Sequence, residues 1–279
     1  MSLQIKVKWE TLSIRCLFLF TFFYLSIINT FSQKLVSQPF IGHTTTNELN
    51  AWCLFKKADT VFIRISNAQK DAVDEKIFLY SKAACFRDFL PVNCHFDGLN
   101  ENTTYHLQYS FDHKNFLPLL SCKTNRDSIT DFSFLAGSCA FIGTGFNGIL
   151  KPFANLSIFN SMKNDSSNFM LWLGDNLYYV FEYHSYKHQL KRNIKTRLNK
   201  KLSAFLNSRQ QYAIWDDHDY GGNNSDGSYK YKTSSLNVFQ QFWCNPRNDG
   251  KNYYTFHQQD CQFFMLDDRY NNENENIGL

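Results

Sequence analysis

Four short apolar runs in this sequence each end in residues that can bind a metal ion or an anion. They are FSFLA before Gly137-Ser138-Cys139, FMLWL before Gly174-Asp175-Asn176-Leu177-Tyr178, YAIW before Asp216-Asp217-His218-Asp219, and FFML before Asp267-Asp268-Arg269. A short apolar run between polar residues predicts a buried strand. Ligands bind at the carboxyl ends of the strands in open α/β sheets. Four such ends therefore predict one metal centre that handles an anion.

Two of these runs offer donors for a highly charged cation. Asp175 and Tyr178 stand three residues apart after FMLWL, and a carboxylate and a phenolate are both hard oxygen donors. Tyrosinate is also a known iron ligand. A thiolate from Cys139 would add a softer donor, so the set favours a transition metal over Mg²⁺ alone. The alternative for Tyr178 is a buried ring whose hydroxyl is hydrogen-bonded within the protein.

The run after YAIW places three carboxylates and an imidazole within four positions. Closely spaced carboxylates repel one another unless a cation neutralises them, which favours a metal site over a plain acidic turn. Asp217 is a candidate ligand of a second cation, and His218 could donate a proton or hold a phosphoryl group. Asn223, in the following glycine-rich turn, could offer an amide oxygen to a hard cation; the alternative is ordinary turn chemistry.

The last motif offers a candidate anion clamp. The planar guanidinium of Arg269 matches a phosphate group, although an ion pair with Asp267 or Asp268 explains it equally well. The sequence has no GxxxxGK[ST] loop, which argues against a nucleotide-driven motor. It also has no GxSxG elbow, which argues against acyl transfer by a serine nucleophile.

Bulk properties and the first residues narrow the class of protein. The chain has 279 residues with 43% hydrophobic residues, and its net charge of +4 is too small to indicate a specific nucleic-acid partner. Lys6, Lys8 and Arg15 precede an apolar stretch at 16–29, which is shorter than a membrane span of about 20 residues. We therefore expect a signal peptide over 1–32, with a retained anchor as the alternative. The mature protein would be secreted, periplasmic or extracellular, without a stable membrane span; nothing indicates its oligomeric state.

Cysteine usage fits an oxidising compartment, where disulfides form. Seven cysteines remain after the signal peptide, namely Cys53, Cys85, Cys94, Cys122, Cys139, Cys244 and Cys261. Because the number is odd, at least one thiol is left over. We expect three disulfides with Cys139 free, the alternative being that Cys139 is itself bonded. Cys244 and Cys261 flank the strand-like YYTF and are candidates for one pair.

The chain divides into two regions of different pattern. TVFIRIS at 60–66 and YHLQYS at 105–110 alternate as half-buried strands do, and no helical period interrupts 37–125. This region is predicted to be a β-sandwich that packs and spaces. Residues 126–279 alternate strands with helical stretches, which indicates an α/β architecture.

A basic helix is predicted inside the second region. Residues 185–208 have apolar positions at helical spacing and many lysines and arginines between them. We expect these basic residues to form a solvated face. The alternative is that they draw phosphate esters toward the anion site.

Two resemblances follow from these motifs. Leu99, Thr103 and Tyr105 resemble a corner of fibronectin type III modules. The four motifs, in their order and spacing over residues 37 to 272, resemble the PhoD-like alkaline phosphatase/phosphodiesterase family of the calcineurin-like metallophosphatases. The resemblance implies an α/β metallophosphatase-like sandwich over 126–279 preceded by an all-β fibronectin/Ig-like domain over 37–125. It also implies Fe³⁺ beside Ca²⁺ or another divalent cation.

The resemblance also assigns roles to residues. It implies that Cys139, Asp175 and Tyr178 bind the iron and that Asp175 also bridges to the second metal. Asn223 matches the second-site ligand, and Asp217 is a further candidate for that site.

The same resemblance implies the substrate and the reaction. Asn176, His218 and Arg269 would lie near the phosphate group of a phosphate ester. A metal-activated water would attack phosphorus. The natural substrate and the preference for monoesters or diesters stay open.

Two departures limit the resemblance. Family members usually carry an arginine where this chain has Asn272, and they have a late Gly-Asp-x-His-type motif that this sequence lacks. We therefore expect a C-terminally truncated, partial catalytic unit. The alternative function is a non-catalytic secreted remnant or binding module.

Overall fold

The computed structural model describes residues 32–128, 130–140, 142, 156–179, 185–248 and 250–272. The signal peptide predicted over 1–32 lies outside these residues, apart from its last position. Within the described part of the chain, no helix is long and apolar enough to cross a membrane.

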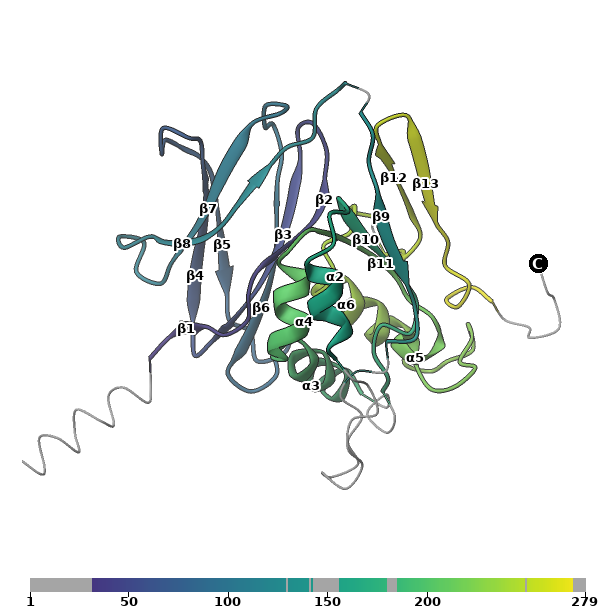
Figure 1. The fold of residues 1–279 in the computed structure, drawn as a ribbon. Coiled ribbons are helices and arrows are strands. Elements are labelled where there is room, and N and C mark those ends of the chain that lie inside the picture. Colours follow the sequence, from purple (N-terminus) through teal and green to yellow (C-terminus); the bar gives the residue numbers. More distant parts are fainter. Residues whose placement is uncertain are drawn as a thin grey trace, which may run out of the picture.

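The first part of the chain forms two antiparallel sheets that face each other (Figure 1). One sheet holds β1 (Lys34–Leu35), β2 (Phe40–Thr44), β3 (Leu49–Lys56) and β6 (Phe89–Phe96), and the other holds β4 (Thr60–Ser66), β5 (Ala72–Leu79), β7 (Thr104–Ser110) and β8 (Leu117–Lys123). The alternation predicted for β4 and β7 is present, since buried positions recur at every second residue over most of each strand. Cys53, Phe55, Ile63 and Leu107 belong to the core between the sheets.

The sheet that contains β3 is buried on both faces. Residues of β3 that point away from the first core, Trp52 and Leu54, join Phe40 in a second core built largely from the helices. Gly42 of β2 makes this close approach possible, because a Cβ atom there would lie 2.1 Å from the carbonyl oxygen of Cys244. The two predicted regions therefore share the core around Trp52 and Phe40, and the boundary between them at 125 stays a prediction.

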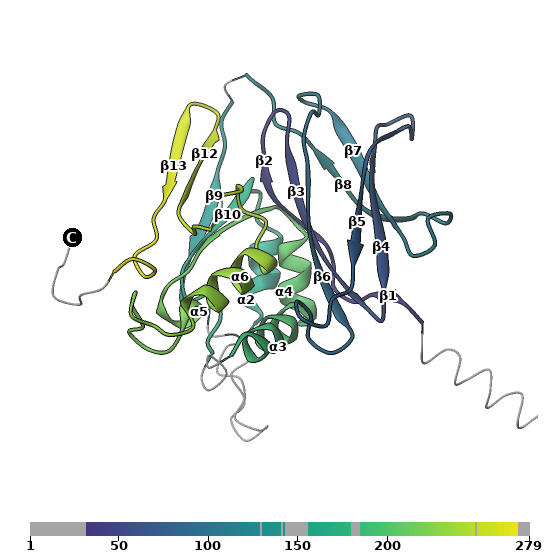
Figure 2. The ribbon, with the colours of Figure 1, turned by 180° about the vertical axis from the view of Figure 1, so that it is seen from behind.

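The second part is built on a three-stranded parallel sheet. It contains β9 (Phe134–Gly137), β10 (Phe169–Leu173) and β11 (Gln210–Ile214), in the order β11-β10-β9. The helices α2 (Ile158–Lys163), α3 (Tyr186–Arg197), α4 (Lys200–Leu206) and α6 (Lys232–Phe242) cover one face, and the hairpin of β12 (Tyr254–Gln258) and β13 (Cys261–Met265) lies on the other (Figures 1 and 2). Phe169 and Tyr212 of the sheet pack against Phe256 of the hairpin. Three of the four predicted strand runs thus lie side by side.

The fourth run forms a strand as predicted, but this strand lies outside the parallel sheet. Most of the FFML segment lies in β13, which among the described strands pairs with β12 alone, antiparallel, in a two-stranded sheet. A tight turn at Gln259, which has a φ of 57°, joins the two strands, and so short a connection can join only antiparallel neighbours. The end of β13 nevertheless reaches the parallel sheet, because the indole Nε1 of Trp215 donates to Oδ1 of Asp267 at 2.7 Å.

The basic helix predicted over 185–208 is two helices, α3 and α4, and two of its basic side chains are buried rather than solvated. The side chain of Asn199 caps the start of α4 by accepting from the backbone N–H groups of Lys201 and Leu202, so the helix over 185–208 breaks at this point. Arg192 and Arg197 are buried, which contradicts a solvated face at these two positions. Arg197 lies 4.3 Å from the ring centroid of a tryptophan and donates to a main-chain carbonyl at the end of α6.

The expected disulfides are absent among the described cysteines, which are all free. Cys244 is buried in the helical core, whereas Cys261 is exposed at the hairpin turn, so the suggested pair lies in two different environments. Cys53 and Cys94 lie on paired strands, but Cys94 is opposite Ala51 in the register. The Cys94 thiol donates to the carbonyl of Ala51 at 3.2 Å instead.

Candidate metal centre

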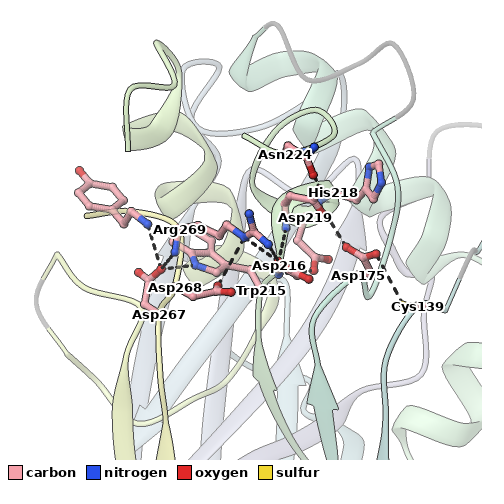
Figure 3. Close-up of polar contacts among 12 residues, drawn as sticks. Cys139, Asp175, Trp215, Asp216, His218, Asp219, Asn224, Asp267, Asp268 and Arg269 are labelled. Carbon is pink, nitrogen blue, oxygen red and sulfur yellow. Dashed lines mark hydrogen bonds and ion pairs between the residues drawn. The ribbon is translucent and has the colours of Figure 1, made fainter. Parts of the chain in front are cut away.

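Three strand ends meet at one edge of the parallel sheet, as Figure 3 shows. The chain leaves β9 toward Cys139, leaves β10 toward Asp175, and leaves β11 into the short helix α5 (Asp217–Tyr220). Because β9, β10 and β11 run parallel, their carboxyl ends lie at the same edge, as the sequence predicted. The metal-binding side chains of this edge come from these three connections.

The backbone of these connections is held in conformations that L-residues rarely adopt. Cys139 and Asp175 have φ values of 55° and 53°, and Gly174 has a φ of 95°. Gly174 is also needed sterically, since a Cβ atom there would lie 2.6 Å from the Cβ of Asp216. A non-glycine residue with such a positive φ lowers the stability of the fold by about 1–3 kcal/mol, and residues of this kind gather at functional sites. Two hydrogen bonds, from the N–H groups of Cys139 and Ala140, join the two connections.

Asp175 is the residue on which the other groups converge. Its Oδ2 atom accepts a hydrogen bond from the hydroxyl of Tyr178 at 2.7 Å, and the thiol of Cys139 lies 3.7 Å from the same atom. The backbone N–H of His218 donates to Oδ1 at 3.3 Å. The structure thus brings together the three residues that the resemblance assigned to iron.

A second carboxylate and an imidazole complete the cluster. The ligand atoms of Asp175, Asp217 and His218 all lie within 4.8 Å of one another. Burial raises the pKa of Asp175; the Tyr178 hydrogen bond and His218 oppose this rise, while the charge of Asp217 adds to it. Burial and the hydrogen bond to Asp175 also raise the pKa of Tyr178. Two carboxylates this close favour a bound cation, which would offset their repulsion.

His218 belongs to this cluster, and Asn176 and Asn223 are two further predicted residues that follow the same strands in the sequence. His218 packs its ring against Tyr178, with centroids 4.3 Å apart. Asn176 is buried and donates from Nδ2 to a strand carbonyl at 2.8 Å, while its Oδ1 atom has no hydrogen-bond partner within the described residues. Asn223 is exposed in the loop after α5. The next residue, Asn224, bonds Asp217 through its backbone N–H at 2.6 Å.

Sequence reasoning missed the role of Asp219. Its buried carboxylate accepts from the backbone N–H groups of Asn176 and Leu177, both at 3.1 Å, and of Asp216, at 3.2 Å. It therefore ties the connection after β10 to the start of α5. The signal was present, because Asp216 and Asp219 have the spacing of a capping box.

Arg269 lies in an ion pair with a partner that the sequence did not suggest. Its Nε atom is 2.6 Å from Oδ1 of Asp216 and 3.5 Å from Oδ1 of Asp268. The contact with Asp268 is one of the two pairs considered from sequence, whereas Asp216 lies 53 positions away. A second missed residue is Arg192, which donates from Nε to the main-chain carbonyl of Tyr178 at 3.0 Å. This hydrogen bond supports the connection after β10, which carries Asp175 and Tyr178.

The likeness of this chain to known proteins lies in its structure. No protein-family model matches the chain, and no curated protein matches it. A solved structure described as the structure of PhoD superimposes with a TM-score of 0.64 at 15% identity and covers 85% of this chain. The likeness shows a PhoD-like fold. This chain spans about half of that protein, since 53% of its length is covered.

Other solved structures match far less well. The sensor domain of the anti-sigma factor RsgI4 in Pseudobacteroides cellulosolvens has a TM-score of 0.28 at 12% identity, covering 37% of this chain and 98% of that one. A glycosyl hydrolase family 2 member from Bacteroides cellulosilyticus has a TM-score of 0.28 at 8% identity, covering 78% of this chain and 36% of that one. Neither likeness is close enough to bear on the fold.

Proposed function

We propose that this chain is a metal-dependent phosphoric ester hydrolase of the PhoD type, acting on phosphate monoesters or diesters. The observation that carries the proposal is the convergence of Cys139, Tyr178 and His218 on the buried carboxylate of Asp175. The PhoD-like fold supports it. The strained backbone at two of these residues supports it as well, because strain is retained where the geometry of a site is needed.

The donor set fits a mixed metal centre. Cys139, Asp175 and Tyr178 would hold Fe³⁺, because a carboxylate and a phenolate are hard donors and the thiolate favours a transition metal. Asp217 and Asn223 would hold Ca²⁺ or another divalent cation through oxygen atoms. Once bound, these ions would polarise the phosphoryl group and activate a water molecule for attack on phosphorus.

The remaining residues of the site would act on the substrate. His218 is partly exposed beside the carboxylates, so its ring could donate a proton to the leaving-group oxygen or bind the phosphoryl group. The unpaired Oδ1 atom of Asn176 could accept from a water molecule at the site. A guanidinium has five N–H donors, and those of Arg269 that do not face its two aspartates could bind a phosphate oxygen.

The proposal extends to the organisation of the whole chain. The β-sandwich over 37–125 would be a fibronectin/Ig-like domain that supports an α/β metallophosphatase-like unit over 126–279. The shared core around Trp52 and Phe40 supports a rigid spacing role for the first domain. The signal peptide over 1–32 would direct the protein out of the cytoplasm.

The direct experiment is hydrolysis of p-nitrophenyl phosphate and bis(p-nitrophenyl) phosphate, with Fe³⁺ and Ca²⁺ supplied. Asp175→Ala should lower the rate by on the order of 10³-fold, because it removes the residue shared by both metal sites. Asp127→Ala removes an exposed carboxylate elsewhere and should leave the rate unchanged. Hydrolysis that survives Asp175→Ala would contradict the proposal. A wild-type chain with neither activity nor bound metal would favour the non-catalytic binding module.

A further inference from the structure

A polar pocket of about 330 Å³ lies away from the metal centre, between the β-sandwich and the segment that joins α6 to β12. Side-chain amides dominate its wall: Asn50, Asn93, Gln240, Asn245, Asn248 and Asn252. Arg247 and Lys251 also line it. Small-molecule sites are often found where two structural units meet, and this volume is at the lower end of their range.

The pocket wall is held rigidly by hydrogen bonds between the two units. Asn93 donates from Nδ2 to the main-chain carbonyls of Gln240 and Trp243 at 2.9 and 3.0 Å. Asn50 donates to the carbonyl of Asn245 at 2.8 Å. Asn245 in turn exchanges two hydrogen bonds with the backbone of Ala213 in β11. These amides are used for structure, so the cavity is formed before any ligand arrives.

One amide of the lining is left without a partner. Asn252 is 3% exposed, and its buried Nδ2 atom has no hydrogen-bond partner within the described residues. A buried donor left unpaired costs about 1–3 kcal/mol. Such a cost is recovered when a ligand supplies an acceptor.

Two positive charges lie at the rim of the pocket among the described residues, and Asp249, between Asn248 and Gly250 in the sequence, lies outside them. Arg247 and Lys251 are exposed cations at its rim, and none of the described residues that line it is an aspartate or a glutamate. His95 lies beside the pocket, since its Nδ1 atom is 2.6 Å from Oδ1 of Asn50, and its Nε2 atom is 3.6 Å from Asp97. Burial, and after it the charge of Arg247, lower the pKa of His95, while the charges of Glu48 and Asp97 oppose this shift. Two cations and an unpaired donor match a group with two negative charges and several acceptor oxygens.

We propose that this pocket binds the phosphate group of a small molecule, held by Arg247, Lys251 and Asn252. A phosphate monoester carries close to two negative charges near neutral pH and three acceptor oxygens, so it fits two cations and an unpaired donor better than a carboxylate does. The ligand would be free phosphate or a phosphorylated compound of about sugar size. The site does not depend on the proposed hydrolysis.

The test is calorimetric titration of the full chain carrying Asp175→Ala, in the presence of a chelator, so that the metal centre cannot bind the probe. Inorganic phosphate and glucose 6-phosphate are the two probes, and acetate is the contrast. We expect saturable binding of at least one phosphate probe, and the stronger of the two identifies the source of the group. Acetate should bind at least tenfold more weakly, because it carries one charge and two oxygens.

Two variants locate the binding. Arg247→Gln should weaken phosphate binding at least tenfold, as expected for one charge-assisted contact. Lys201→Gln removes an exposed cation on α4 and should not change it. Both replaced side chains are exposed, so neither change should affect folding.

His95 provides a spectroscopic readout. Its pKa, followed by NMR, should rise when phosphate saturates the pocket, because the anion offsets the charge of Arg247. Absence of saturable phosphate binding, equal binding by Arg247→Gln, or an unchanged His95 pKa at saturation would each overturn the proposal. Because the metal centre is disabled throughout, such a failure leaves the hydrolysis experiment unaffected.

Discussion

Replacing Asp219 should destabilise the protein more than replacing any other carboxylate of the site. The side chain is 2% exposed and accepts three backbone hydrogen bonds, two from the connection after β10 and one from the start of α5. A net contribution of about 1 kcal/mol for each bond gives a loss of about 3 kcal/mol. Burying unpaired N–H groups adds to this, so we expect Asp219→Ala to cost about 3–5 kcal/mol.

The assay is equilibrium unfolding in urea, followed by circular dichroism on metal-free protein. The matched control is Asp217→Ala, two positions away. Asp217 accepts one backbone hydrogen bond, from Asn224 at 2.6 Å, and its removal relieves repulsion with Asp175. The control should therefore lose about 1 kcal/mol or less.

The comparison of the two variants can refute this reasoning. An Asp219→Ala protein that loses less than about 1 kcal/mol would show that its three hydrogen bonds do not hold the loops together. An equal loss in both variants would show that the negative charge of these carboxylates decides stability at this edge. The hydrogen bonds that Asp219 accepts from the two connections would then have no special role.

Two further predictions rest on the backbone and on burial. Gly174→Ala should lower the free energy of unfolding by more than about 2 kcal/mol, because φ is 95° and the new Cβ would lie 2.6 Å from a neighbouring Cβ. Gly98→Ala is the control: its φ is 66° and no atom lies within 4 Å of the new Cβ, so the loss in the same urea assay should be about 1 kcal/mol. Equal losses of stability in the two variants would refute this. Burial, then the charge of a second histidine, lowers the pKa of His43 to about 4. The unfolded chain therefore takes up this proton first, and stability should fall by about 3 kcal/mol as the pH drops from 7 to 4. When unfolding is measured across this pH range, the stability of His43→Gln should fall less than that of the wild type. An equal fall would contradict the assignment of this pH dependence to His43.

Much of the site could be predicted because its residues directly follow strands. Cys139, Asp175 and Asp217 each come within a few positions of an apolar run, and the parallel arrangement of those runs brings their ends together. Periodicity in the sequence carries this information, because the alternation of buried positions and the short length of the runs identify strands locally.

The parts that could not be predicted depend on contacts distant in the sequence. Arg269 pairs with Asp216 through the return of β13 to the sheet, and nothing near either residue indicates the other. Arg197 is buried because a sheet of the first region packs on the helices, whereas a basic residue on a helix predicts exposure. The pairing of β13 could not be predicted for a similar reason, since an apolar run does not reveal which strand it pairs with.

The measurement that tests the central claim most directly is the metal content of the purified protein and of its Asp175→Asn variant, by mass spectrometry after equilibration with Fe³⁺ and Ca²⁺. The account predicts stoichiometric iron with a divalent cation in the wild type, and loss of both in the variant without loss of the folded state. Wild-type protein that is folded but binds no metal, or a variant that retains its iron, would contradict it.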